Sequence, residues 1–444
     1  MATVLGMPPL IVKSPAASNL EPGGFLNLVV TASGTGPLSY QWTRDGVTMA
    51  GATASSLKVT TGGTYAVTVT SPYGQASTVP VSIANPIDVG PLAGEYNGLI
   101  RAADSTSDGA LNQSAWVSVV VNRSGSMSGR LLSRTGVPQT FTGRCDQAGN
   151  LVFEKGSSLA VLSGSQTVGN LTMAIVTAES GRKLVGQVMA AAGGVAVERA
   201  KFTAAPIRAV GTSELGRYTA VFERKGATVA SEPAGSGVAS FSVSAAGVSF
   251  TGKLADGSSV SFSARVCEGG WVPVFIPLYS GRGFLAGEFQ FNVLAERSDA
   301  MGSGMMWYRD RGETSAGNYP AGWPNGISLD LVASKFDATR GFGFQPSFDG
   351  RLKLTATEAG LKTPVEQLLG LTRNTVLAVA SNSAVRLGAK FTASSGFVEG
   401  TFVPVGSRSS AAYTGVVLQK AGYAAGYFTN NRLSGLVDIR PVAP

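Results

Sequence analysis

Alternation of apolar and polar residues over positions 238–266 is the feature that most constrains what this chain can fold into. Phe, Val and Leu recur at every second position there, with Ser, Thr and Lys between them, and small or turn residues interrupt the pattern at 245–247 and 256–257. A period of two is typical of strands that have one buried and one wet face, and Asp-Gly favours a tight reversal. The stretch therefore predicts three antiparallel strands.

Similar stretches recur before and after this one. Gly-Arg-Tyr at 216–218 echoes Gly-Glu-Tyr at 94–96, and Thr-Gly-Lys-Leu at 251–254 echoes Ser-Gly-Arg-Leu at 128–131. Because the order of the elements is preserved, we interpret the chain as containing an internal duplication. At 444 residues and 44% hydrophobic, it is long enough for several cores.

We therefore expect an all-β protein in which a first sandwich is followed by two or three antiparallel β-barrel-like or sandwich repeats. The expected domains are 1–87, 88–210, 211–325 and 326–444, the last either separate or merged with the repeat before it.

Residues 1–87 resemble a bacterial immunoglobulin-like domain. Trp42, in an alternating segment that ends at an Asp-Gly turn, matches the core tryptophan of strand C, and Tyr65 in Gly-Thr-Tyr-Ala-Val matches the tyrosine corner. The two family cysteines are absent, and Val30 and Val67 stand near their places. The resemblance implies a sandwich that rests on apolar packing, and it implies no chemistry.

The glycine-rich strand repeats that follow resemble those of large multi-domain bacterial surface and secreted proteins. This likeness implies an extracellular or cell-surface location. The first seven residues lack the basic start and apolar core of a signal peptide, and no run approaches the roughly 20 apolar residues of a membrane-spanning segment.

Composition argues against several classes of function. The sequence has no histidine, the commonest general base and a common zinc ligand. Cys145 and Cys267 each end an alternating stretch; we expect two separate thiols, with one inter-domain bridge as the alternative. The net charge of +8 comes from basic residues scattered singly, which does not predict a nucleic-acid site.

Motifs for catalysis and for metal binding are weak. Residues 247–253 have the glycine and lysine spacing of a phosphate-binding loop, but Leu254 stands where Ser or Thr would hold magnesium. Residues 104–109 gather oxygen ligands without the spacing of an EF-hand, which favours a solvated hairpin loop. We expect surface positions for four carboxylates that would otherwise be candidates for a glycosidase pair: Glu288, Glu296, Asp310 and Glu313. Residues 363–369 carry the N-cap, proline and capping-box glutamate of a short helix.

One aromatic group remains as a candidate binding site, in Pro- and Gly-rich sequence: Trp307, Tyr308, Tyr319 and Trp323. Tyr and Trp suit a sugar-stacking platform or a protein interface, and they equally suit a plug in a core. All three interpretations stay open at this point.

The sequence thus favours a non-enzymatic structural or adhesive protein, as a subunit of a surface assembly or as a binding stalk. We expect no catalytic residue, cofactor or metal, and a protein partner or self-association through strand edges. The alternative is a carbohydrate-binding module that uses the aromatic group at 307–323.

Overall fold

The computed structural model describes residues 6–18, 20, 24–85, 88–102, 114–154, 159–163, 166–179, 181–192, 195–291, 297–312, 319–343, 351–372, 376–379 and 386–442. Over these residues the chain is strands and turns with a few short 3-10 helices and no α-helix. The strands divide between two compact units. One contains the N-terminal domain together with Val121–Met127 and Arg144–Asn150, and the other contains Gly94–Val120, Ser128–Gly143 and the described chain from Leu151 onward.

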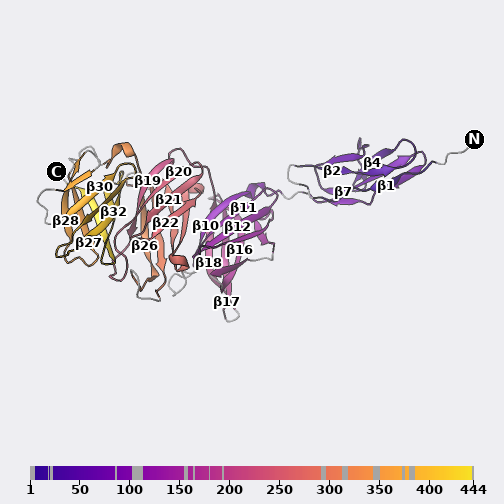
Figure 1. Ribbon diagram of the computed structural model, residues 1–444. Helices are drawn as coiled ribbons and strands as arrows, with labels where there is room; N and C mark the ends of the chain where they lie inside the picture. Colours follow the sequence, from indigo (N-terminus) through magenta and orange to yellow (C-terminus); the bar gives the residue numbers. More distant parts are fainter. Residues whose placement is uncertain are drawn as a thin grey trace, which may run out of the picture. The chain divides into compact units, whose positions relative to one another are not determined.

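The N-terminal domain is an immunoglobulin-like sandwich (Figure 1, indigo to violet). Its ladders join β1 with β3, β2 with β6, and β4 and β7 with β5, β8 and β9. The strands are β1 (Leu10–Lys13), β2 (Leu26–Val29), β3 (Thr31–Ser33), β4 (Ser39–Arg44), β5 (Val47–Thr48), β6 (Ser56–Val59), β7 (Gly63–Ser71), β8 (Gly74–Ser77) and β9 (Val81–Ile83).

Both residues that carried the immunoglobulin resemblance take their expected places. Trp42 is fully buried, and its indole Nε1 donates to the carbonyl oxygen of Ala54 at 2.8 Å. The hydroxyl of Tyr65 donates to the carbonyl oxygen of Thr61, four residues upstream, at 2.8 Å, which is the bond of a tyrosine corner. Val30 and Val67 lie in the same core, so apolar packing stands where a disulfide would lie.

The remaining strands form three antiparallel meanders (Figure 1, purple to yellow). The first meander consists of β10 (Gly94–Ala102), β11 (Ala115–Val121), β12 (Ser126–Ser133), β13 (Pro138–Cys145), β14 (Asn150–Phe153), β15 (Leu159–Ser163), β16 (Gln166–Ala178), β17 (Gly181–Ala192) and β18 (Val195–Pro206). The second meander consists of β19 (Gly216–Arg224), β20 (Gly237–Ser244), β21 (Gly247–Lys253), β22 (Ser259–Ala264), β23 (Trp271–Leu278), β24 (Gly283–Phe291), β25 (Ala300–Arg309) and β26 (Trp323–Lys335). The third meander consists of β27 (Arg351–Glu358), β28 (Val365–Thr372), β29 (Val376–Val379), β30 (Leu387–Thr392), β31 (Phe397–Phe402), β32 (Ala411–Leu418), β33 (Tyr423–Asn430) and β34 (Leu433–Pro441). Four 3-10 helices are described: η1 (Gly90–Leu92), η3 (Glu268–Gly270), η4 (Tyr279–Gly281) and η5 (Ala338–Arg340).

In each meander the first strand pairs with the last: β10 with β18, β19 with β26 and β27 with β34. The third meander is a closed barrel of eight strands. In the first, β14 also pairs with β16, which joins the two arms of the sheet and leaves β15 outside the ring. The second has no ladder between β22 and β23 and stays open there.

Packing of aromatic rings over glycines explains part of the glycine content of these strands. Gly186 lies directly opposite Phe202 on the neighbouring strand, and Gly435 lies directly opposite Phe428. In both pairs a Cβ on the glycine would collide with the phenyl ring. Glycine in a strand often marks such a close approach, and here it makes room for a core ring.

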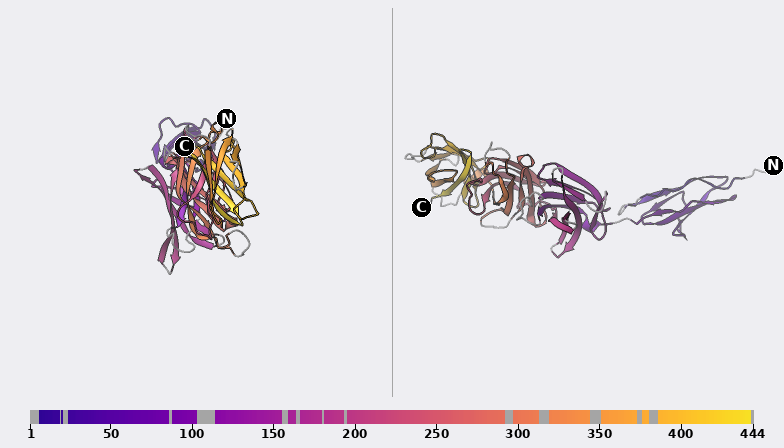
Figure 2. Two further views of the ribbon diagram at one scale, coloured as in Figure 1. Left: turned by 90° about the vertical axis from the view of Figure 1, so that its left-hand side faces the viewer. Right: turned by 90° about the horizontal axis from the view of Figure 1, so that it is seen from below.

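Neighbouring meanders pack against one another in chain order, as Figures 1 and 2 show for β10 to β34. Leu99 of the first meander shares a buried cluster with Phe275, Phe284 and Tyr308 of the second. Val416 and Tyr427 of the third belong to the core cluster of the second. The four-domain division remains a prediction; β26, which the boundary at 325 would cut, lies in the second meander.

The expected helix at 363–369 is wrong. Val365, Gln367 and Leu369 are buried and the residues between them are exposed, so this segment is the strand β28. Pairing with β27 in the closed barrel outweighs the local capping signal. Among the described residues, no helix has the length and hydropathy needed to span a bilayer.

Candidate functional site

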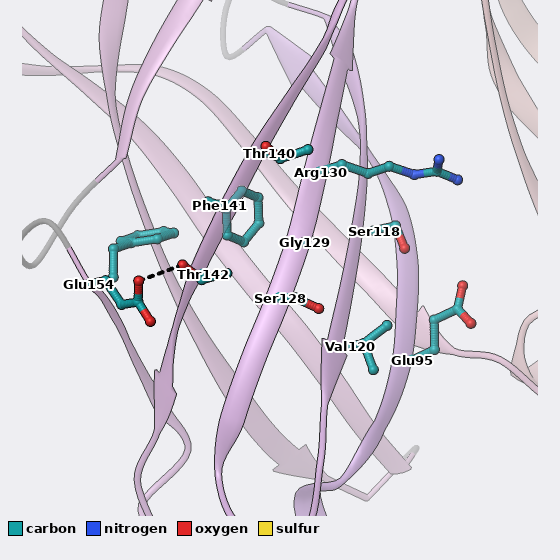
Figure 3. Close-up of a pocket in the computed structure, with 11 residues that line it drawn as sticks. Glu95, Ser118, Val120, Ser128, Gly129, Arg130, Thr140, Phe141, Thr142 and Glu154 are labelled. Carbon is teal, nitrogen blue, oxygen red and sulfur yellow. Dashed lines mark hydrogen bonds between the residues drawn. The ribbon is translucent and has the colours of Figure 1, made fainter.

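A hollow of about 750 Å³ lies on the first meander and is lined by residues of β10 to β14 (Figure 3). We call it the β10–β14 hollow. Most of its polar lining lies at exposed or half-buried positions that alternate with core residues along each strand. These residues are Glu95, Ser128, Arg130, Thr140, Thr142 and Glu154, and the buried Ser118 completes the polar lining.

Strand alternation puts these side chains on the outer face of the sheet. On β11, Val117 and Val119 are fully buried while Val120 between core positions is exposed. On β12, Met127 and Leu131 point into the core, and so Ser128 and Arg130 point out. Hydroxyl side chains therefore line the hollow together with apolar surface from Val120, Phe141 and Phe153.

Each charged group of the hollow has a neighbour that fixes it. Oε1 of Glu95 accepts from the Asn97 amide at 3.2 Å, and a carboxylate oxygen of Glu154 accepts from the Thr142 hydroxyl at 2.8 Å (Figure 3). The Arg130 guanidinium lies over the Trp116 ring, 4.9 Å from its centroid. The hollow thus presents hydrogen-bonding groups in fixed positions and charges of both signs.

Its two carboxylates lie too far apart to act together on one bond. Glu95 belongs to β10 and Glu154 follows β14, four strands away, and Figure 3 shows them on opposite sides of the labelled residues. Four spacings of about 4.8 Å give roughly 19 Å along the sheet. Paired carboxylates of glycoside hydrolases are about 5 to 10 Å apart. This arrangement suits a surface that binds better than one that catalyses.

The aromatic group at 307–323 forms no exposed platform. Trp307, Tyr319 and Trp323 lie in the core of the second meander and Tyr308 lies in the cluster facing the first; none is more than 5% exposed. The hydroxyls of Tyr319 and Ser434, in the third meander, are 3.0 Å apart. The geometry agrees with the core interpretation left open by the sequence, because no ring face is accessible to a sugar.

Two of the four candidate carboxylates, Glu288 and Asp310, are held by arginines of the first meander. Glu288 pairs with Arg101 at 3.1 Å, and Asp310 pairs with Arg134 at 2.7 Å. Glu296, Glu313 and the candidate calcium loop at 104–109 lie outside the described residues. Where the chain is described, no cluster of three acidic, Cys or His residues has metal-binding geometry.

Both cysteines are free and buried, as separate thiols. Burial raises the pKa of Cys145 to about 11, with a further contribution from Asp146. Burial raises the pKa of Cys267 to about 12. Since the thiolate is the nucleophile, neither is activated for chemistry at neutral pH.

No motif in the sequence points to the hollow. Alternation alone marks Ser128, Arg130, Thr140 and Thr142 as outward residues, so the signal was present. What the sequence does not contain is the order of the strands and the shape of the sheet, which bring Glu95 and Glu154 to one surface.

No family model matches the chain, and no curated protein matches it. Among solved structures, it is similar to transferrin binding protein B from serogroup B Neisseria meningitidis, with 11% identity, 79% of this chain and 76% of that chain covered, and a TM-score of 0.20. It is also similar to the four N-terminal Ig domains of Dscam1 isoform 7.44, with 13% identity, 59% and 98% covered, and a TM-score of 0.18. A quinonprotein alcohol dehydrogenase-like protein from Bacteroides thetaiotaomicron shows 9% identity, 98% and 98% covered, and a TM-score of 0.17. Values this low carry no inference about function.

Proposed function

We propose that this chain is a non-enzymatic structural or adhesive protein of the cell surface or extracellular space. Its binding face is the β10–β14 hollow, through which copies of the chain associate. The observation that carries the proposal is the spread of charged and hydroxyl groups over five strands, with no convergence on a reacting atom. The lack of histidine in the sequence and the buried, unactivated thiols support the same view.

The composition of the hollow suits a protein partner. Non-obligate protein interfaces are about as apolar as the rest of the surface and combine apolar contacts with hydrogen bonds. Val120 in the hollow and Val152 on the outer side of β14 are 44% and 51% exposed, among hydroxyl groups and charges of both signs. A face with both signs of charge is able to complement a second copy of itself.

Association through strand edges is less favoured than the sequence suggested. The third meander is closed, and β23, an edge strand of the second, carries Pro273 and Pro277, which have no N–H to donate. Among the described strands of the three meanders, β15 and β22 are the end strands without proline, and we place the contact on a sheet face instead.

Light scattering over a wide concentration range tests the proposal. We expect a mass that rises with concentration, and a Ser128→Arg/Thr140→Arg double variant that stays monomeric because two bulky cations fill the hollow. Ser249→Arg/Thr401→Arg places the same charges on exposed positions of the second and third meanders and should associate as the unmodified chain does. A strict monomer at every concentration would overturn self-association.

A further inference from the structure

A second cleft, of about 430 Å³, lies where the first and second meanders meet. The first meander contributes Asn97 from β10 and Arg182 and Lys183 from β17, and the second contributes Glu268, Trp271 and Glu288. We call it the Trp271 cleft. Its volume lies within the roughly 300 to 1,000 Å³ of small-molecule sites.

Trp271 is unusual among the tryptophans of this chain. It is 40% exposed, while Trp42, Trp307 and Trp323 are at most 1% exposed. An indole left at the rim of a polar cleft presents a flat apolar surface that the fold does not use. Such a ring stabilises a bound ligand by stacking.

The turn before Trp271 fixes the backbone at the start of β23. Gly269 and Gly270 have φ angles of 75° and 79°, the left-handed region that favours glycine. The N–H of Gly270 donates to the carbonyl of Cys267 at 3.0 Å, and the N–H of Cys267 donates to the carbonyl of Trp271 at 2.7 Å. The Gln290 amide closes the turn by donating to the carbonyl of Gly269 at 2.6 Å. A backbone fixed in this way loses little further conformational entropy when a ligand binds beside Trp271.

The polar groups of the cleft are balanced in charge. Arg182 and Lys183 supply two positive charges, Glu268 and Glu288 supply two negative ones, and Arg101 pairs with Glu288 at 3.1 Å. The two carboxylates would repel an anionic ligand, and the two basic side chains would repel a cationic one. A neutral ligand rich in hydroxyl groups is able to use donors and acceptors together.

Asn97 carries an acceptor that the fold leaves unmet. The residue is 3% exposed, its Nδ2 donates to Glu95 at 3.2 Å, and its Oδ1 is buried without a hydrogen-bond partner. An unmet buried acceptor is costly. A ligand hydroxyl that draws this amide toward the cleft, directly or through a water, would satisfy it.

We propose that the Trp271 cleft binds a neutral oligosaccharide of hexopyranose units. The indole stacks on the C–H face of one sugar ring, and the charged side chains and the Asn97 amide bond to its hydroxyls. The cleft shares no lining residue with the β10–β14 hollow, although the Asn97–Glu95 bond joins the two, and the proposal does not depend on the function proposed above.

Titrations with maltohexaose, cellohexaose and hexa-N-acetylchitohexaose, followed by tryptophan fluorescence and calorimetry, test the proposal. We expect at least one of the three to bind with a Kd on the order of 1 mM or tighter. Trp271→Ala should weaken that binding about tenfold, while Trp271→Phe, which keeps a flat ring, should retain most of it. Val405→Ala, at an exposed apolar position of the third meander, is the matched control and should bind as the unmodified chain does.

The proposal is overturned if none of the three sugars binds, or if Trp271→Ala binds as well as the unmodified chain. Because Trp271 is partly exposed, the variant should keep its fold, which far-UV circular dichroism checks. Trp271→Ala should leave the light-scattering mass unchanged and Ser128→Arg/Thr140→Arg should leave sugar binding unchanged, so the two proposals fail separately.

Discussion

The second and third meanders follow one plan and differ in closure. Both are eight antiparallel strands with the first paired to the last, but only the third forms a closed ladder. Trp307 and Trp323 lie within the core of the second, whereas the sequence has no tryptophan from 351 to 441. An eight-stranded barrel has an interior just wide enough for its side chains, so larger rings require a wider sheet. No ladder closes the second meander between β22 and β23, and Pro273 and Pro277 on β23 lack the N–H groups that a ladder uses.

The largest expected effect tests whether the indoles support the open sheet. Trp307→Ala should destabilise the protein by about 4 kcal/mol, because it leaves a cavity in the core of the second meander. It also removes the bond from the indole Nε1 to the hydroxyl of Tyr279. Denaturant unfolding measures the change, with Thr251→Ala, exposed on β21, as a control within about 0.5 kcal/mol. A loss below about 1 kcal/mol would show that the ring does not support this core.

A glycine substitution in the third meander tests whether its core ring needs the space beside Gly435. A Cβ at Gly435 would collide with the Phe428 ring and with the carbonyl oxygen of Thr357, so Gly435→Ala should cost about 2 to 3 kcal/mol. Gly388 lies in the same barrel with no atom within 4 Å of such a Cβ. Gly388→Ala should therefore change the unfolding free energy by less than about 1 kcal/mol in either direction. Equal losses in both variants would contradict the role given to the ring at Gly435.

Alternation predicts the strands well and their closure poorly. The three strands expected from 238–266 form as β20, β21 and β22, and Trp42 and Tyr65 take the places that their motif assigns. Alternation reports local burial, while closure depends on which distant strands meet. For the same reason the capping signal at 363–369 was misleading, because the pairing of β28 with β27 decided that segment.

Exposure of the candidate aromatic residues also depends on how distant strands meet. Trp307 and Tyr308 are adjacent in sequence, so a strand directs them to opposite faces, and the structure buries one in the core and the other against the first meander. Trp271 begins β23, which is apolar throughout, and the Gly-Gly turn and the neighbouring meander place it at a cleft. Exposure of an aromatic residue is thus a property of assembly between meanders.

A buried and an exposed ion pair are expected to differ in their contribution to stability, by an amount between the two effects above and the one below. Glu214, before the second meander, has a side chain 5% exposed that accepts from Arg208 at 3.0 Å and from the N–H of Gly211 at 2.8 Å. Burial alone would raise the pKa of Glu214, but the bonds from Arg208 and Gly211 outweigh it and hold the pKa below its usual 4.5. This stabilisation is present above pH 4.5 and is lost as the pH falls through the lower pKa of the folded state.

Glu214→Gln should therefore cost about 2 kcal/mol at neutral pH and reduce the acid sensitivity of unfolding below pH 4.5. In the third meander, Lys353 and Glu366 form the exposed counterpart, with side chains 44% and 56% exposed. Glu366→Gln should change stability by no more than about 0.5 kcal/mol. Denaturant unfolding at several pH values measures both, and an unchanged acid profile in Glu214→Gln would refute the assignment.

The smallest expected change in unfolding free energy concerns one tyrosine hydroxyl in the second meander and one in the third. The Tyr279 hydroxyl donates to Asp256 at 2.7 Å and accepts from Trp307 at 3.0 Å, whereas the Tyr413 hydroxyl donates once, to the carbonyl of Gly388, at 3.1 Å. Burial raises the pKa of both phenols, so both stay protonated and able to donate at neutral pH. Tyr279→Phe leaves an indole N–H with no acceptor and removes a donor from Asp256, and should cost about 1.5 kcal/mol; Tyr413→Phe should cost about 0.5 to 1 kcal/mol. Denaturant unfolding of both variants measures the difference. If Tyr413→Phe proved the more costly, the polar bonds around Trp307 would not be what holds the open sheet in shape.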